Sequence, residues 1–212
     1  RDAVAACIEI FERRETGQSQ GKGSSNDGTA QKSVRMEGVA VFRKEKLAGF
    51  LDTEETKGYL YAIGRAKQGI ISISLHDHIK KDIAIAMTRA SSSIIPKVDG
   101  DEIEFIVDIH AEGDLQQHDD TKPVADPEIM KIIEEKTAQE IKAMVEKALN
   151  KAKNEFEADI FGFGSCLHKK YPKIWKSIKD DWREIYPDIK VTVKTKVKIR
   201  RTGMLIDTPT IR

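Results

Sequence analysis

The sequence predicts an α+β protein of two domains, each a mostly antiparallel sheet with packed helices, the second with one long helix. Two observations predict this fold class. Several short runs alternate apolar and polar residues, which is typical of strands that bury one face. The segment 126–156 instead keeps apolar residues at helical spacing, and strands are predicted on both sides of it. This order of elements favours helices packed on a sheet.

The chain has 212 residues, enough for one large or two small domains, and a net charge of only +1. The charged residues are distributed unevenly along it. Residues 99–121 contain nine acidic residues and no lysine or arginine, whereas residues 168–201 contain twelve lysines or arginines and four acidic residues. The two blocks are either partner surfaces or complementary parts of one sheet, and we favour the second interpretation.

Residues 1–33 are interpreted as the tail of an upstream domain followed by a linker. Residues 16–33 are rich in glycine, serine and asparagine, which is typical of a linker. Because the chain begins with Arg1 inside an apolar pattern, we expect that a further N-terminal part, with any targeting signal, precedes it. Over residues 1–14 the apolar side chains have helical spacing, which predicts the last helix of the upstream domain: Val4, Ile8 and Phe11.

Residues 34–97 are predicted to form a middle α+β domain. A hairpin with its turn at 44–45 is expected first, followed by a helix capped by Asp52 or Thr53. Two further strands follow, and the residues 91–93 with Pro96 are expected to break or redirect the second of them. The predicted strands are 39–42, 47–51, 70–75 and 83–90, and the predicted helix is 53–63.

Residues 98–212 are predicted to form the C-terminal domain, in which Asp126 caps the long helix 126–156. The strand 102–112 has an acidic outer face, and the strand 189–200 has a basic outer face. We predict that these two strands lie in the same sheet with the acidic face beside the basic face, because opposite charges on neighbouring strands favour that register.

A glycine turn and a single helix are predicted between the long helix and the basic strand. Gly162 and Gly164 mark a tight turn or a close backbone contact. Prolines bound the helix over 172–187. Trp175 and Trp182 lie seven residues apart, so they are expected on one face of that helix and in the core.

The sequence contains no convincing catalytic or metal-binding constellation. Neither 76–78 nor 110–120, although rich in histidine and acidic residues, has the ligand spacing of a zinc or calcium site. Cys166 and His168 would suit a cysteine hydrolase, but residues two apart on a helix point in different directions. No cofactor is predicted, because the glycines fit no phosphate-binding loop. No nucleic-acid partner is predicted from one cationic strand without exposed aromatic residues.

Several uncommon residues recur in a defined order and spacing along residues 34–203. In the middle region they are 38–42, 46–47, 49, 51–52 and 54–55, and toward the C-terminus they are 159–164, 168, 171–172, 175, 181–182 and 199–203. In these residues the chain resembles the C-subunit family of spore nutrient germinant receptors, the lipoprotein subunits of receptors in endospore-forming bacteria.

The resemblance implies a non-enzymatic subunit that assembles with the integral-membrane A and B subunits of the receptor to trigger germination. It implies a position on the outer face of the spore inner membrane, held by an N-terminal lipid anchor outside this chain. Neither Cys7 nor Cys166 matches the family's lipid-modified cysteine. The candidate partner-contact or family-motif residues are Gly162, Gly164, His168, Trp175, Trp182, Lys194, Lys196, Lys198, Arg200 and Arg201.

Two alternative functions remain open at this point. One is a module that binds the germinant or another small molecule itself, which requires a well-formed and mostly apolar pocket. The other is a hydrolase that uses Cys166 and His168, which requires the two side chains to meet.

Overall fold

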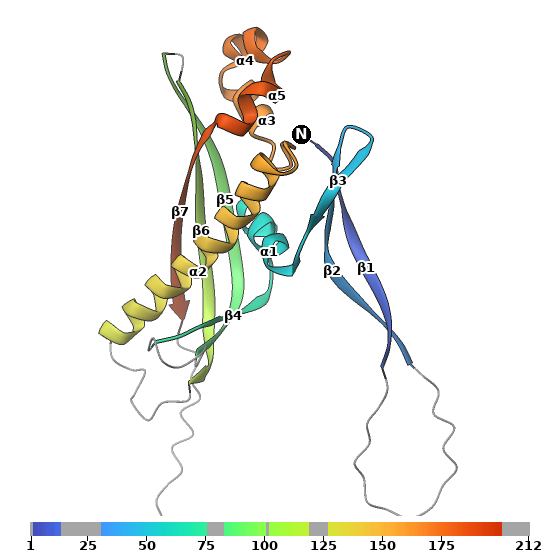
Figure 1. Cartoon of the computed structure of the whole chain (residues 1–212). Coiled ribbons are helices and arrows are strands. Elements are labelled where there is room, and N and C mark those ends of the chain that lie inside the picture. The colour runs from blue at the N-terminus through green and yellow to red at the C-terminus, as the bar shows by residue number, and fades with distance from the viewer. Residues whose placement is uncertain (1, 14–30, 76–82, 101, 119–126, 201–212) are drawn as a thin grey trace, which may run out of the picture.

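The computed structural model describes residues 2–13, 31–75, 83–100, 102–118 and 127–200. It contains a three-stranded sheet and a four-stranded sheet, with helices packed against them (Figure 1). The α+β fold class is therefore confirmed. The strands are β1 (Val4–Arg13), β2 (Gln31–Arg43), β3 (Lys46–Leu51), β4 (Gly69–Ile73), β5 (Ile83–Asp99), β6 (Glu102–His118) and β7 (Lys190–Arg200). The helices are α1 (Thr53–Ala62), α2 (Pro127–Asn154), α3 (Phe163–Lys170), α4 (Pro172–Ile178), α5 (Trp182–Ile185) and the short 3-10 helix η1 (Tyr186–Asp188).

The first strand corrects the prediction of a helix over residues 1–14. β1 pairs antiparallel with β2, from Val4 opposite Val41 to Arg13 opposite Gln31. Apolar residues are so frequent at the start of the chain that helical spacing and strand alternation both fit them, and the pairing with β2 decides between the two. The predicted linker over 16–33 lies largely outside the described residues.

The predicted hairpin and helix of the middle region are confirmed. β2 and β3 pair antiparallel across the turn at 44–45. The Asp52 side chain accepts a hydrogen bond from the Glu55 N–H, and the Glu55 side chain accepts one from the Asp52 N–H, each at 2.7 Å. This capping box fixes the start of α1. Burial acts to raise the pKa of Asp52, but the hydrogen bonds from Glu55 and Lys147 outweigh it and hold the pKa below its ordinary value of 3.8.

β5 corrects the expectation that a strand ends near residues 91–93. It continues to Asp99 and stays in register with β6 through Pro96. β4 pairs only with residues 83–87 of β5, so the remainder of β5 lies at an edge of the sheet. A proline is tolerated there because no neighbouring strand in the described ranges needs its missing N–H.

The four-stranded sheet has the order β4-β5-β6-β7. Its strands pair antiparallel except for β6 and β7, which are parallel and are connected through the helices α2 to α5. The boundary expected between residues 97 and 98 falls within the β5–β6 hairpin. The two sheets separate between β3 and β4 instead.

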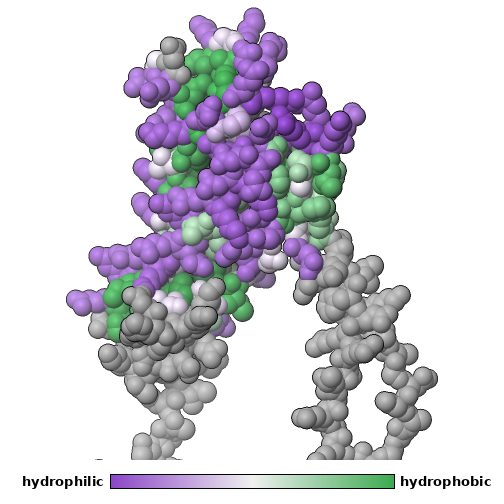
Figure 2. Space-filling view, viewed as in Figure 1, coloured by the Kyte–Doolittle hydropathy of each residue, from purple (hydrophilic) through white to green (hydrophobic). Residues whose placement is uncertain are grey.

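α2 crosses the four-stranded sheet and packs on β7 and α1 (Figure 1). Its buried face includes Ile133, Ile141 and Val145, as predicted, whereas Ile132 is exposed. The outer surface along α2 is mostly hydrophilic, and one of the hydrophobic patches lies near β3, where Leu47 and Phe50 are exposed (Figure 2). Asp126, the expected cap of this helix, lies outside the described residues.

The expected single helix over 172–187 is wrong. The chain turns at 179–181 and separates α4 from α5. Trp175 and Trp182 therefore meet from two different helices, with ring centroids 5.3 Å apart in an edge-to-face arrangement. Trp182 is buried and Trp175 is half-buried, so both contribute to the core. None of the helices in the described ranges has the length and apolar character needed to cross a membrane.

Candidate functional site

The candidate residues fall into two separate regions. One is the tryptophan cluster, which we define as Asp159, Gly164, His168, Trp175 and Trp182. The other is the basic face of β7, which we define as Lys190, Lys194, Lys196, Lys198 and Arg200. The structure brings together the members of each group. Of the two remaining candidates, Gly162 lies in the turn before α3, whereas Arg201 lies outside the described residues, as do His76, Asp77 and His78.

Asp159 holds the backbone turn at the base of the tryptophan cluster. Its buried carboxylate accepts hydrogen bonds from the N–H groups of Gly162, Phe163 and Gly164 at 2.8–2.9 Å. Gly162 has a φ of 84°, a left-handed conformation that favours glycine. The predicted tight glycine turn is thereby confirmed, and Asp159 satisfies the first N–H groups of α3.

Gly164 is the point where the backbone comes closest to both tryptophans. A Cβ atom at this position would lie 2.8 Å from Trp175 Cη2 and 2.9 Å from Trp182 Nε1. The Trp182 Nε1 group also donates a hydrogen bond to Asp159 at 3.4 Å. The predicted close backbone contact is confirmed, and the absence of a side chain at Gly164 lets the two rings pack over α3.

The N-terminal segment contributes a residue to this region that the sequence did not indicate. Asp2 and Asp159 are joined twice: the Asp2 N–H donates to the Asp159 carbonyl at 3.0 Å, and the Asp159 N–H donates to Asp2 Oδ2 at 2.8 Å. Tyr186 is buried nearby, and its pKa is raised by burial and then by the charges of Asp159 and Asp2. In the sequence, the only local signal of such a hydrogen-bonded position is Asp159, the aspartate shortly before the FGFG turn.

His168 packs against Trp175, with ring centroids 6.0 Å apart, and is exposed. Cys166 is half-buried on the same helix, two residues away. Side chains at this spacing leave a helix in different directions, so the geometry of α3 does not favour a cysteine–histidine pair for hydrolysis.

A cavity of about 400 Å³ lies beside the tryptophan cluster. Its size is typical of small-molecule pockets, but such pockets are lined mostly by apolar side chains. This cavity has charged residues of both signs around the rings, so it does not match the apolar pocket that a germinant-binding module requires. Its lining includes Asp2, Asp159, His168, Trp175, Lys179, Asp180, Trp182 and Arg183.

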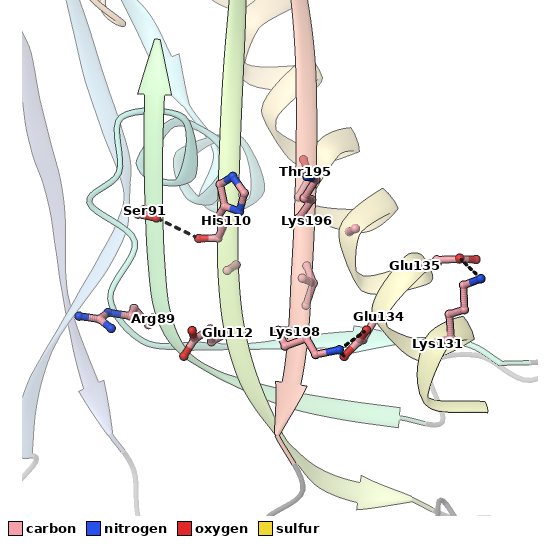
Figure 3. A pocket seen from close by; sticks show the side chains of 13 residues that line it. Arg89, Ser91, His110, Glu112, Lys131, Glu134, Glu135, Thr195, Lys196 and Lys198 are labelled. Carbon is pink, nitrogen blue, oxygen red and sulfur yellow. Dashed lines mark hydrogen bonds and ion pairs between the residues drawn. The ribbon is translucent and has the colours of Figure 1, made fainter. Parts of the chain in front are cut away.

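The basic face of β7 lies beside the acidic face of β6, as predicted. Strict alternation places the lysines on the exposed side of β7 and the apolar residues on the buried side. Lys190 pairs with Glu104, and Arg200 pairs with Glu112 at 2.6 Å. Lys198 pairs with Glu134 of α2 at 3.3 Å, which is visible in Figure 3. The ion pair with Glu104 raises the pKa of Lys190. Two cations of the basic block thus pair with acidic residues of β6 in the same sheet, and a third pairs with α2.

Lys194 and Lys196 differ from their neighbours on the basic face. Both are exposed, and neither forms an ion pair with a described residue. They lie opposite Asp108 and His110 of β6 in the strand register. Those two residues contact each other at 3.6 Å. The centre of the basic face therefore offers two adjacent cations for a partner.

The fold of the chain matches one solved structure over most of its length. The crystal structure of the GerBC protein superposes with a TM-score of 0.70 at 18% sequence identity, covering 79% of this chain and 52% of that chain. This likeness defines the class of fold, an α+β arrangement shared with a larger protein.

The chain belongs to the family described as "Spore germination B3/ GerAC like, C-terminal", whose model matches residues 37–203. Among curated proteins of Bacillus subtilis (strain 168), it is 31% identical to Spore germination protein YndF over 82% of this chain and 43% of that protein. It is 25% identical to Spore germination protein KC over 81% of this chain and 42% of that protein. The resemblance to the spore germination family is thereby confirmed, and the chain spans less than half the length of these relatives.

Proposed function

We propose that this chain is part of a non-enzymatic subunit of a spore nutrient germinant receptor, and that it assembles with integral-membrane A and B subunits to trigger germination. In this proposal the subunit lies on the outer face of the spore inner membrane, and a lipid anchor outside this chain holds it there. The family membership and the names of the relatives, which are spore germination proteins, support the proposal. The arrangement of Cys166 and His168 on α3 supports a role other than hydrolysis.

The observation that carries the proposal is the pair of cations at the centre of the basic face. Lys190, Lys198 and Arg200 are paired within the described chain, whereas Lys194 and Lys196 are exposed without a described ion pair. Complementary charges guide a partner to the correct surface and register. A rigid strand holds the two ammonium groups on the same face of the sheet. We propose that an acidic surface of a membrane subunit binds here.

The test is a pull-down from spores that make the full-length protein with Lys194→Glu and Lys196→Glu together. Both side chains are exposed, so the variant is expected to fold normally, and circular dichroism checks this. We expect that the variant recovers at least about tenfold less of the membrane subunits, because two attractive charges become repulsive, and that germination with nutrients slows.

A matched control is the double variant Lys173→Glu and Lys176→Glu in α4. These residues are also exposed, and the net charge changes by the same amount. We expect this control to recover the membrane subunits at the wild-type level. Normal assembly and germination of the β7 variant would refute the assembly role of the basic face.

A further inference from the structure

β7 is the outermost strand of the four-stranded sheet, so one of its sides has no neighbouring strand among the described residues (Figure 1). The Ile199 N–H donates to the Glu134 carboxylate of α2 at 3.0 Å, which shows that this N–H points away from β6. The N–H and C=O of one strand residue point to the same side, and the side alternates along the strand. The backbone groups of Val193, Thr195 and Val197 therefore also point away from β6. We call these three residues the open edge.

The space beside Thr195 and Val197 of the open edge is hollow. A hollow of about 810 Å³ extends from α2 around β7 to the outer face of β6. In Figure 3, β7 lies between β6 and α2, with Thr195 and Lys196 at the middle of the strand and Glu134 reaching Lys198. Glu134 accepts the N–H of Ile199, but no described residue accepts those of the open edge. The hollow borders Thr195 and Val197 of the open edge.

A buried hydroxyl group marks the same position. The Thr195 Oγ atom is buried and has no hydrogen-bond partner among the described residues. A buried polar group without a partner destabilises the folded state. Thr195 also lines the hollow beside the open edge. A partner that supplies a hydrogen-bonding side chain opposite Thr195 would remove this cost.

The side chains around the open edge define what such a partner would contain. Lys194 and Lys196 flank Thr195 on the outer face of the sheet and have no described ion pair. On the other side of β7, the neighbouring strand β6 places acidic residues on this face, including Asp108 and Glu112. β7 therefore already pairs with one strand that has acidic side chains on this face. A second acidic strand on its other side would place opposite charges beside the unpaired Lys194 and Lys196.

We propose that the open edge binds an extended peptide segment as an additional strand of the sheet, with acidic side chains on the outer face and a hydroxyl-bearing side chain opposite Thr195. Main-chain hydrogen bonds supply affinity in this mode, and alternate side chains supply specificity. If the proposed function holds, the segment belongs to a membrane subunit of the receptor. Lysines also protect strand edges against unwanted pairing, but protection alone does not account for the unpaired Thr195 hydroxyl.

The test in solution is a titration of the isotope-labelled 212-residue chain with a capped peptide of alternating threonine and glutamate, followed by NMR. We expect shift changes and slower hydrogen exchange at the amides of Val193, Thr195 and Val197. The amides of Thr192 and Lys194 already face β6, so their exchange is expected to change little. The same peptide with N-methyl groups at alternate amides is expected to bind at least about tenfold more weakly, because it cannot form the new ladder.

The matched variants are Thr195→Pro and Thr195→Val. Proline removes only an N–H that points away from β6, so the β6–β7 ladder stays intact, and we expect peptide binding to be lost. Valine keeps the N–H and removes the hydroxyl, so a smaller loss is expected.

If Thr195→Pro does not fold, the N-methylated peptide decides the question. Equal binding of the methylated and unmethylated peptides, or no change at the open edge, would overturn strand addition. The spore pull-down of the Lys194→Glu and Lys196→Glu variant tests the proposed function separately. A failure of strand addition can therefore be distinguished from a failure of the proposed function.

Discussion

Asp159 is buried, and its carboxylate accepts hydrogen bonds from three consecutive backbone N–H groups and from the indole of Trp182. These donors all lie in the turn or the helices that form the tryptophan cluster. One carboxylate therefore fixes both the start of α3 and the position of α5. Hydrogen bonds to a charged acceptor are stronger than those between neutral groups, so we expect Asp159 to contribute strongly to the stability of the fold.

We predict that Asp159→Ala lowers the free energy of unfolding by about 3 kcal/mol or more, because it leaves several buried donors without an acceptor. Urea unfolding followed by tryptophan fluorescence measures this change. The chain has only two tryptophans, and both lie in the cluster, so the signal reports on this region. The control is Asp180→Ala, which removes a highly exposed carboxylate at the same cavity. A loss for Asp159→Ala as small as that of the control would contradict the role of Asp159.

Single residues also show how far the sequence predicts the site. The need for glycine at Gly164 was predictable, because a repeated Phe-Gly pattern before a helix indicates a close contact. The pairing of Asp159 with Asp2 was not, because the two residues are 157 positions apart. Lys194 and Lys196 were indistinguishable from Lys198 in the sequence, since the ion pair that separates them involves Glu134 of a different element.

At the scale of whole elements, contacts between segments that are distant in the sequence also determine the packing, as the contact between α1 and α2 shows. Gly58 lies where the two helices cross, and a Cβ atom there would lie 2.0 Å from the carbonyl oxygen of Met144. The obstructing atom belongs to the backbone, so it cannot move aside by rotation of a side chain. The two helices must separate to accept any side chain at Gly58.

We predict that Gly58→Ala destabilises the fold by more than about 3 kcal/mol, because overpacking against a backbone atom displaces a helix. Gly69→Ala is the matched control, since a Cβ atom at Gly69 would meet nothing within 4 Å. Its effect is expected within about 0.5 kcal/mol. Thermal unfolding by circular dichroism measures both variants. Equal melting temperatures for the two variants would show that the helices tolerate a wider separation.

The elements that were predicted correctly have one strong local pattern. β7 alternates strictly because one side is buried and the other is exposed, and α1 has a complete capping box at its start. β1 was predicted wrongly because its apolar residues fit two periods, and its partner strand decides the outcome. The break between α4 and α5 was missed because it is stabilised by packing between two tryptophans and Gly164, which no local period reveals.

At the scale of the whole molecule, charge complementarity predicted that β6 and β7 lie in one sheet. The parallel direction of that pair, and the position of the division between the sheets, depend on contacts between distant segments. The sheet places the acidic strand on one side of β7, and on the other side no described strand is its neighbour. Both the basic face and the open edge therefore result from the position of β7 as the last strand of the sheet.

The role proposed for the centre of the basic face is contact with a membrane subunit of the germinant receptor. The most direct measurement places a photo-crosslinking amino acid at Lys196 of the full-length protein in intact spores, with the same amino acid at Lys176 of α4 as the control. We predict a crosslink from position 196 to an integral-membrane subunit and none from position 176. Crosslinks from position 176 alone, or equal yields from both positions, would contradict the claim.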